Sequence, residues 1–137
     1  MLHLMKLAVG IRDLGHLREV QAERARLTPP LRHLTRNQPR RAAEVLDGGS
    51  IYWVVAGSLL VRQRILDIQP AEDADATALL LDPVMVPLAG RPTRPFQGWR
   101  YLAPAAAPPD LDAIPAASGG DALPAALQRD LRSLGLL

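Results

Sequence analysis

The chain has 137 residues, 48% of them hydrophobic and 22% charged, with a net charge of +2, which fits one ordinary globular domain over residues 1–137. It contains no cysteine, which excludes disulfides, thiolate nucleophiles and cysteine-based zinc or iron–sulfur sites. Residues 1–66 carry eleven Lys/Arg against five Asp/Glu, whereas residues 67–137 carry five against nine. This asymmetry is typical of a nucleic-acid footprint, and equally of two halves that pair their charges within the fold.

The N-terminus predicts a buried strand. Residues 3–9 form an apolar run that is interrupted by Lys6 and closed by Gly10. The run is too short to span a membrane, and no small-residue cleavage site follows it. We therefore expect a cytoplasmic protein with no membrane partner.

Two helices are predicted next. The first has Asp13 as its N-cap and ends at Thr28-Pro29-Pro30. Residues 31–39 are basic and are predicted to form a loop. Residues 40–46 are good helix formers, and the glycine pair at 48–49 supplies a left-handed residue that ends this second helix.

From residue 50 the pattern changes to that of a β-hairpin. Segments 51–55 and 58–68 are rich in branched and aromatic residues, and Ala56-Gly57 between them is a turn signal. A two- or four-residue loop pairs Val54 with Leu59, Trp53 with Leu60 and Tyr52 with Val61. This register places Trp53 on one face with Arg62 and Arg64, and Tyr52 on the other.

Two guanidinium groups on one strand face need a neutralising anion. Within the chain, Glu44, Asp47 or Asp67 would serve, with the arginine stems packed on Trp53. The alternative is a bound anion or phosphate. The sequence leaves both open.

The second half predicts further strands and a long connection. Residues 69–76 form an acidic loop that lacks the glycine and glutamate of a calcium site, and strands follow over 77–81, 84–88 and 96–102. Residues 103–122 form a Pro/Ala/Gly-rich connection. A C-terminal helix over 123–135 carries a leucine stripe that either docks on the core or binds a protein partner or a second copy.

All five aromatic residues fall in two clusters, at 52–53 and 96–101. We predict that Tyr52 and Phe96 pack in the core. The remaining rings and their basic neighbours then mark a ligand-binding or nucleic-acid-binding surface, which consists of Trp53, Arg62, Arg64, Gln97, Trp99 and Arg100.

Several stretches together resemble an uncharacterised family, DUF1489, met chiefly in alphaproteobacteria. They are the N-terminal His-Leu-x-Lys-Leu-x-Val-Gly and segments 41–55, 62–68, 81–83 and 95–102. The resemblance covers nearly the whole chain. It implies a bacterial, cytoplasmic, single-domain protein and brings no established activity.

These elements predict an α+β fold: a small, mostly antiparallel sheet or partly open barrel with two N-terminal helices and one C-terminal helix. By analogy, the order of elements is similar to PUA-like and ASCH-like barrels, which commonly bind RNA or modified nucleotides. The leading hypothesis is therefore a non-catalytic module that binds RNA or a nucleotide. A protein-interaction or small-ligand domain is the first alternative.

An enzyme acting on an anionic substrate is the second alternative, with Asp47 or Asp67 opposite arginines as its site. The three histidines, His3, His16 and His33, show no metal-ligand spacing, so we expect neither a metal nor a cofactor. No serine has the context of a nucleophile. The catalytic residues of such an enzyme stay unknown.

Overall fold

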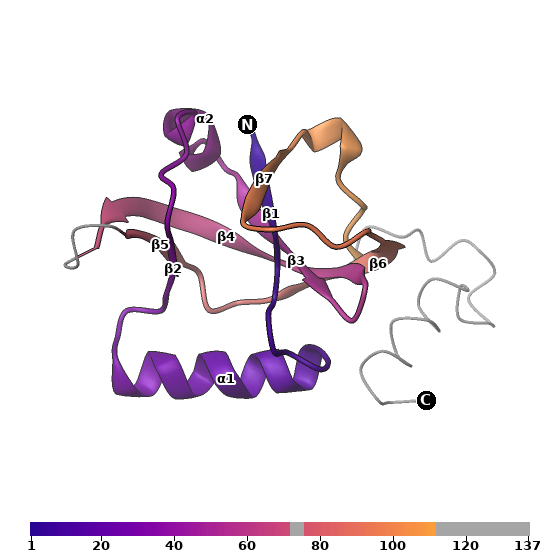
Figure 1. The fold of residues 1–137 in the computed structure, drawn as a ribbon, viewed down its shortest axis with the longest axis horizontal. Helices are drawn as coiled ribbons and strands as arrows, with labels where there is room; N and C mark the ends of the chain where they lie inside the picture. Colours follow the sequence, from indigo (N-terminus) through magenta and orange to yellow (C-terminus); the bar gives the residue numbers. More distant parts are fainter. Residues whose placement is uncertain (72–75, 112–137) are drawn as a thin grey trace.

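The computed structural model of the chain describes residues 1–71 and 76–111. Most of this part forms one seven-stranded sheet that curls into a partly open barrel (Figure 1). The strands are β1 His3–Leu7, β2 Arg32–Thr35, β3 Ser50–Val55, β4 Ser58–Pro70, β5 Thr77–Leu81, β6 Val86–Pro92 and β7 Trp99–Leu102. Two helices, α1 Leu14–Leu27 and α2 Ala42–Leu46, and a short 3-10 helix, Pro104–Ala106, complete it.

The strand order is β2-β5-β4-β3-β1-β7, and β6 pairs with β4 outside this path. The long β4 curls the sheet, because its first half pairs with β3 and β6 and its second half pairs with β5. The β1–β3 pair is parallel and the other pairs are antiparallel. The predicted α+β class with a mostly antiparallel, partly open sheet is confirmed, whereas the C-terminal helix over 123–135 and most of the 103–122 connection lie outside the described residues.

The sheet is open between β2 and β7, and the loop after β2 bridges this opening. Trp99 Nε1 donates a hydrogen bond to the carbonyl of Asn37 at 2.9 Å. The backbone N–H of Arg41 donates to the hydroxyl of Tyr101 at 3.0 Å. The second aromatic cluster therefore supports the closing loop of the barrel.

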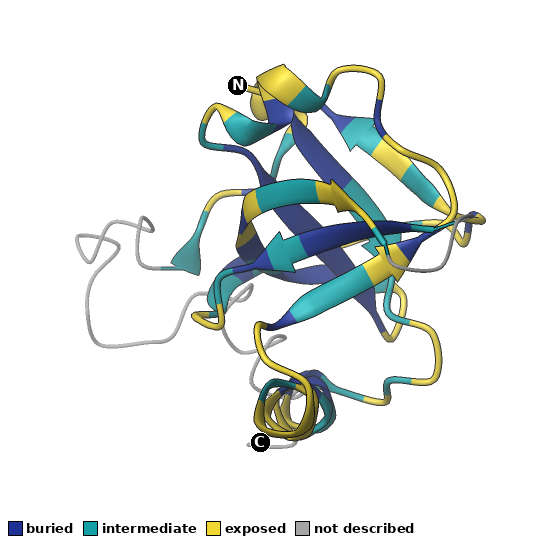
Figure 2. Cartoon of the chain, turned by 90° about the vertical axis from the view of Figure 1, so that its left-hand side faces the viewer, coloured by how far each residue is buried: buried dark blue, intermediate teal, exposed yellow. Residues whose placement is uncertain are grey.

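Helix α1 crosses one end of the curled sheet. Asp13 caps it as predicted, since its side chain accepts a hydrogen bond from the N–H of His16 at 2.8 Å. The helix is buried only along the side that faces the sheet (Figure 2), through Leu14, Leu17 and Gln21. On that side Gln21 and Gln63 of β4 exchange two side-chain hydrogen bonds of 2.7 and 2.8 Å.

The glycine pair after α2 ends the helix as predicted. Gly48 has a φ of +83°, the left-handed conformation that the prediction requires. Gly49 is restricted by space instead, because a Cβ there would lie 2.1 Å from the Leu2 carbonyl oxygen and 2.4 Å from that of Val45. This close approach lets β1 and α2 pack together at the start of β3.

The hairpin of β3 and β4 differs from the predicted register. Ala56 and Gly57 form the two-residue turn with positive φ, and Val54 pairs with Leu59 as predicted. A β-bulge then inserts Leu60, so that Trp53 pairs with Val61 and Tyr52 pairs with Arg62. The predicted face assignment is wrong: Trp53 does not share its face with Arg62 and Arg64.

Two further predictions of secondary structure, one of a loop and one of a strand, were wrong in part. Residues 31–39 were predicted to form a loop, but β2 lies within them and pairs with β5. The strand predicted over 84–88 lies instead at Val86–Pro92 and continues through Gly90, because β4 offers it a pairing edge. The strand predicted over 96–102 is confirmed for its second half, β7.

The core has two parts, one on each face of β3. The larger part lies inside the curl beneath α1 and includes Leu4, Leu17, Ile51, Trp53 and Leu79. The smaller part lies on the opposite face and contains Tyr52, Val54, Leu59, Leu88, Phe96 and Leu102. Tyr52 and Phe96 are therefore packing residues, as predicted.

Candidate functional site

The two aromatic clusters meet across β1. Lys6 lies opposite Trp53 of β3 and opposite Trp99 of β7. Residues that pair laterally in a sheet point to the same face, so the three side chains form a row inside the curl. Trp53 is 3% exposed, whereas Trp99 is partly exposed at the rim.

A cavity of about 290 Å³ lies beside this row. Its walls come from the end of β1, the inner side of α1 and the start of β2, which approach one another only in the folded chain. Most lining side chains are apolar, and three are cationic. The lining residues are Lys6, Leu7, Ala8, Val9, Ile11, Leu17, Val20, Gln21, Arg24, Leu31, Arg32, His33, Trp53 and Leu81.

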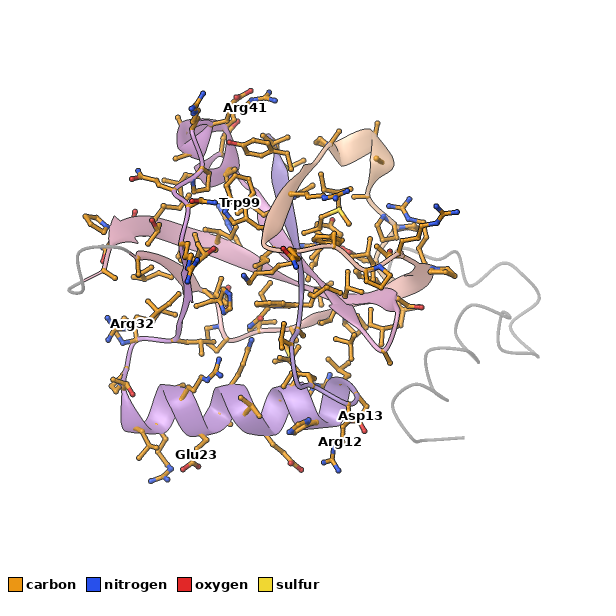
Figure 3. All side chains as sticks on the ribbon, viewed as in Figure 1. Arg12, Asp13, Glu23, Arg32, Arg41 and Trp99 are labelled. Carbon is orange, nitrogen blue, oxygen red and sulfur yellow. The ribbon has the colours of Figure 1, made fainter. Side chains whose placement is uncertain are left out.

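A second hollow of about 350 Å³ adjoins the first over the last turn of α1. The two share Arg24, Arg32 and His33, and the second adds Thr28 and Leu34. Arg32 starts β2 and lies above the C-terminal end of α1 (Figure 3). We call the two hollows together the basic cleft.

The three cations of the basic cleft have no acidic partner in the part of the chain that the structure describes. The ion pairs found there join Arg26 to Glu23, Arg41 to Glu44, Arg62 to Asp110 and the N-terminus to Asp47. Burial lowers the pKa of Lys6, because the charged amine is less well solvated there than in water. Cations that line an apolar cavity without a neutralising carboxylate favour an anionic ligand.

His33 forms part of the same wall. Its ring stands edge-on to Trp53, with centroids 5.0 Å apart and planes at 86°. Its Nε2 is buried and has no hydrogen-bond partner among the described residues. Burial, then the charges of Lys6 and Arg24, lower the pKa of His33 to about 4, so the imidazole is neutral at pH 7.

The reciprocal glutamine pair fixes the floor of the cleft. Trp53 Nε1 donates to Gln63 Oε1 at 2.9 Å, and Gln63 Nε2 also donates to the carbonyl of Asp82 at 3.0 Å. Gln63 is fully buried. This network holds the indole of Trp53 and the inner side of α1 in one position.

The structure separates the residues predicted to form the binding surface. Trp53 lines the basic cleft, and Trp99 lies in the same row, with its N–H committed to Asn37. Arg62 shares the opposite face with Tyr52. The others are exposed: Arg64, Gln97 and Arg100, with the Arg100 guanidinium 5.0 Å from the Phe96 ring centroid.

Arg62 is neutralised from within the chain, by a partner that was not predicted. Its Nε and Nη2 donate to the two carboxylate oxygens of Asp110 at 2.8 and 2.7 Å, and its Nη1 donates to Ser50 Oγ at 3.0 Å. The candidates Glu44, Asp47 and Asp67 do not pair with it. The bulge at Leu60 explains the difference, because it turns Arg62 away from Trp53 toward the 103–111 segment.

A shallow hollow of about 320 Å³ lies beside the Arg62–Asp110 pair and is also lined by His3 and Tyr52. The N–H of Ser50 donates to His3 Nδ1 at 3.0 Å, and burial, followed by the Arg62 charge, lowers the pKa of His3. The Asp110 carboxylate is already bound bidentately by Arg62. We interpret this group as a clamp between the sheet and the 103–111 segment.

Sequence reasoning missed four residues of the basic cleft: Lys6, Arg24, Arg32 and His33. Lys6 carried a signal, since it is a charge in the middle of a buried run. Arg32 and His33 fall in the segment predicted to be a loop, and Arg24 falls on the predicted stripe of the first helix, where nothing in the sequence singles it out. Their convergence depends on the β2–β5 pairing and on the docking of α1.

The described residues contain no group of three or more His, Asp or Glu that could hold a metal ion. None of the helices in residues 1–71 and 76–111 is long and apolar enough to cross a membrane.

Fold and site together define a class: a sheet-rich α+β domain with a basic, partly apolar cleft beside its first helix. A family model described as "Protein of unknown function (DUF1489)" matches residues 4–137, and the chain belongs to this family. No curated protein and no solved structure matches the chain. The predicted family membership is therefore confirmed.

Proposed function

We propose that the chain is a binding module without catalytic activity, and that it takes a nucleotide, free or at the end of an RNA chain, in the basic cleft. One observation carries this proposal: Lys6, Arg24 and Arg32 surround an apolar cavity and have no acidic partner among the described residues. Phosphate groups satisfy such cations through charge-assisted hydrogen bonds.

The cavity also suits a nucleobase. The apolar side chains of α1 and β1 offer a water-poor surface on which a base packs, and Trp53 and Gln21, both buried and hydrogen-bonded to Gln63, form the floor beneath it. The volume of about 290 Å³ lies near the lower end of the range for ligand pockets, roughly 300–1,000 Å³. One nucleoside is thus a better match than several stacked bases.

This proposal keeps the predicted ligand class and moves its site. Trp53 remains a residue of the site, as part of the buried floor of the cleft, while Lys6, Arg24 and Arg32 take the role that was predicted for Arg62, Arg64 and Arg100. The analogy with PUA-like barrels, which commonly bind RNA or modified nucleotides, supports the same ligand class.

Tryptophan fluorescence tests the proposal directly. The chain has two tryptophans, so Trp99→Phe leaves Trp53 as the single reporter within the cleft. We expect ATP and a short single-stranded RNA to change the emission of Trp53 at low salt, with binding that weakens as salt rises. In the same background, Lys6→Ala or Arg24→Ala should weaken binding about tenfold or more.

Arg64→Ala is the matched control, because Arg64 is exposed and does not line the cleft. Its affinity should equal that of the parent. If Arg64→Ala and Arg24→Ala lose the same affinity, the ligand binds at the surface predicted from the sequence and not in the basic cleft. If neither ATP nor RNA binds at low salt, the proposal is wrong.

A further inference from the structure

The basic cleft consists of two chemically different compartments. The first holds Trp53 and nearly all of the apolar lining, which suits a base and its sugar. The second has five lining residues, of which Arg24, Thr28, Arg32 and His33 are polar. Because Arg24, Arg32 and His33 line both, a ligand that fills the first compartment reaches the second past two guanidinium groups.

The second compartment attracts anions through side chains and not through the helix. It lies over the last turn of α1, where Thr28 is the C-cap and the N–H of Thr28 is already bonded to the carbonyl of Arg24. The C-terminal end of a helix dipole disfavours anions. Any phosphate held there depends on Arg24 and Arg32, with the Thr28 hydroxyl as a further donor.

The size of the second compartment exceeds the need of one phosphate. It is a hollow of about 350 Å³ that is open to solvent, so a ligand can extend beyond its first phosphate. Two separate arginines, one from α1 and one from β2, flank it. An extended chain of phosphates uses both guanidinium groups, whereas a monophosphate leaves part of this positive surface unpaired.

We infer that the ligand is a 5′-polyphosphorylated nucleoside, with its base beside Trp53 and its phosphates between Arg24 and Arg32. This inference rests on the proposed function and narrows it to a substrate class. The same chemistry occurs in free nucleoside di- and triphosphates and at the 5′-triphosphate end of an RNA. The shared feature is a phosphate chain joined to one terminal nucleoside.

A phosphate ladder tests the inference. Adenosine, AMP, ADP and ATP are titrated against the Trp99→Phe protein, with Trp53 emission as the signal. We expect affinity to rise along the ladder, with ATP bound at least about tenfold more tightly than AMP, since each added charge-assisted contact contributes in that range. A 5′-triphosphate RNA and the same RNA with a 5′-hydroxyl form the second arm.

Two variants separate the compartments. Thr28→Val removes a hydroxyl that lines the second compartment alone, so it should weaken ATP binding and leave AMP binding unchanged. Arg32→Ala should reduce the difference in affinity between AMP and ATP. Arg26→Ala is the matched control, because Arg26 lies in the same helical turn as Arg24 but pairs with Glu23 and lines neither compartment. Thermal melts of all variants verify that each is folded.

The outcomes separate this inference from the proposed function. An affinity that rises from adenosine to ATP, and rises less in Arg32→Ala, supports both the inference and the proposed function. Binding of the 5′-triphosphate RNA without binding of ATP also supports the inference and identifies the RNA end as the source. If adenosine, AMP, ADP and ATP bind with equal affinity and both RNAs bind clearly, the inference is overturned and the proposed function stands. If none of these ligands binds, both are overturned.

Discussion

At the scale of single residues, His33 has a pKa that lies far below that of an ordinary histidine. A neutral imidazole beside two cations and an indole differs from a histidine in water, where the pKa is near 6.5. The unfolded chain therefore binds a proton before the folded chain does as the pH falls. Stability rises with pH wherever the unfolded state holds more protons, so this histidine costs stability on the acid side.

We predict that the free energy of unfolding falls as the pH is lowered from about 6.5 to about 4, and that His33 contributes up to about 3 kcal/mol of this loss. His3 acts in the same direction because burial and Arg62 lower its pKa. Urea unfolding at several pH values should give a smaller slope in this window for His33→Gln than for the parent. A proton NMR titration that places the pKa of His33 near 6.5 would contradict the burial of its ring.

At the scale of elements, a polar contact inside the core joins α1 to β4, beside the apolar packing of Leu14 and Leu17. The Gln21–Gln63 pair, Trp53 and the Asp82 carbonyl satisfy one another, and Gln63 has no access to solvent. A buried polar group that loses its partners costs more than an exposed one, because water cannot replace them. The pair thus fixes the orientation of α1 against β4.

We expect Gln63→Ala to destabilise the fold by about 2–4 kcal/mol, since it leaves the Trp53 indole N–H and the Gln21 amide without partners and opens a cavity. Gln69→Ala on the exposed end of the same strand should change stability by less than about 0.5 kcal/mol. Chemical denaturation measures both. If the two variants lose the same small amount, the glutamine network does not hold the helix.

The elements that the sequence predicted correctly have local causes. Asp13, the Ala56-Gly57 turn and Gly48 each act within a few residues of their own position. The strand β2 was missed because its four residues, two of them basic, become a strand only through pairing with β5. The bulge at Leu60 was missed because no residue type in the hairpin marks it.

The candidate site was predictable only in part. The location of the aromatic clusters suggested that rings mark the site, and Trp53 does line the cleft. Its cations come from β1, α1 and β2, so no short motif contains them. A one-residue shift in a hairpin exchanges the faces of all residues beyond it, and this shift moved Arg62 from the predicted surface to the clamp with Asp110.

At the scale of the whole molecule, the Arg62–Asp110 clamp ties the 103–111 segment to the sheet. The segment is also held by the Leu88–Asp110 bridge and by a hydrogen bond from the Ala89 N–H to the Pro109 carbonyl. Both clamp side chains are about one quarter exposed, 25% for Arg62 and 27% for Asp110. The clamp lies on the opposite face of the sheet from the basic cleft, so the two are expected to act independently.

We predict that a double-mutant cycle with Arg62→Ala and Asp110→Ala gives a coupling energy of about 1–2 kcal/mol, between the values for exposed and buried pairs. The Arg41–Glu44 pair, whose side chains are about twice as exposed, should couple much more weakly. Neither clamp variant should change the affinity of the basic cleft for ATP. A clamp variant that abolishes nucleotide binding in a folded protein would show that the two faces are linked.

The pH dependence of this coupling supplies an independent check. The hydrogen bonds from Arg62 lower the pKa of Asp110 below its ordinary value of 3.8. The carboxylate is therefore stabilised by folding, and its contribution is present above the unfolded pKa and is lost as the pH falls through the lower folded pKa. The coupling energy should stay constant between pH 7 and pH 5 and decline below about pH 4, whereas the loss due to His33 occurs above that pH. Unfolding curves for the four cycle members at pH 7, 5 and 3 separate the two effects, and a coupling energy that declines already between pH 7 and pH 5 would assign it to a histidine instead of Asp110.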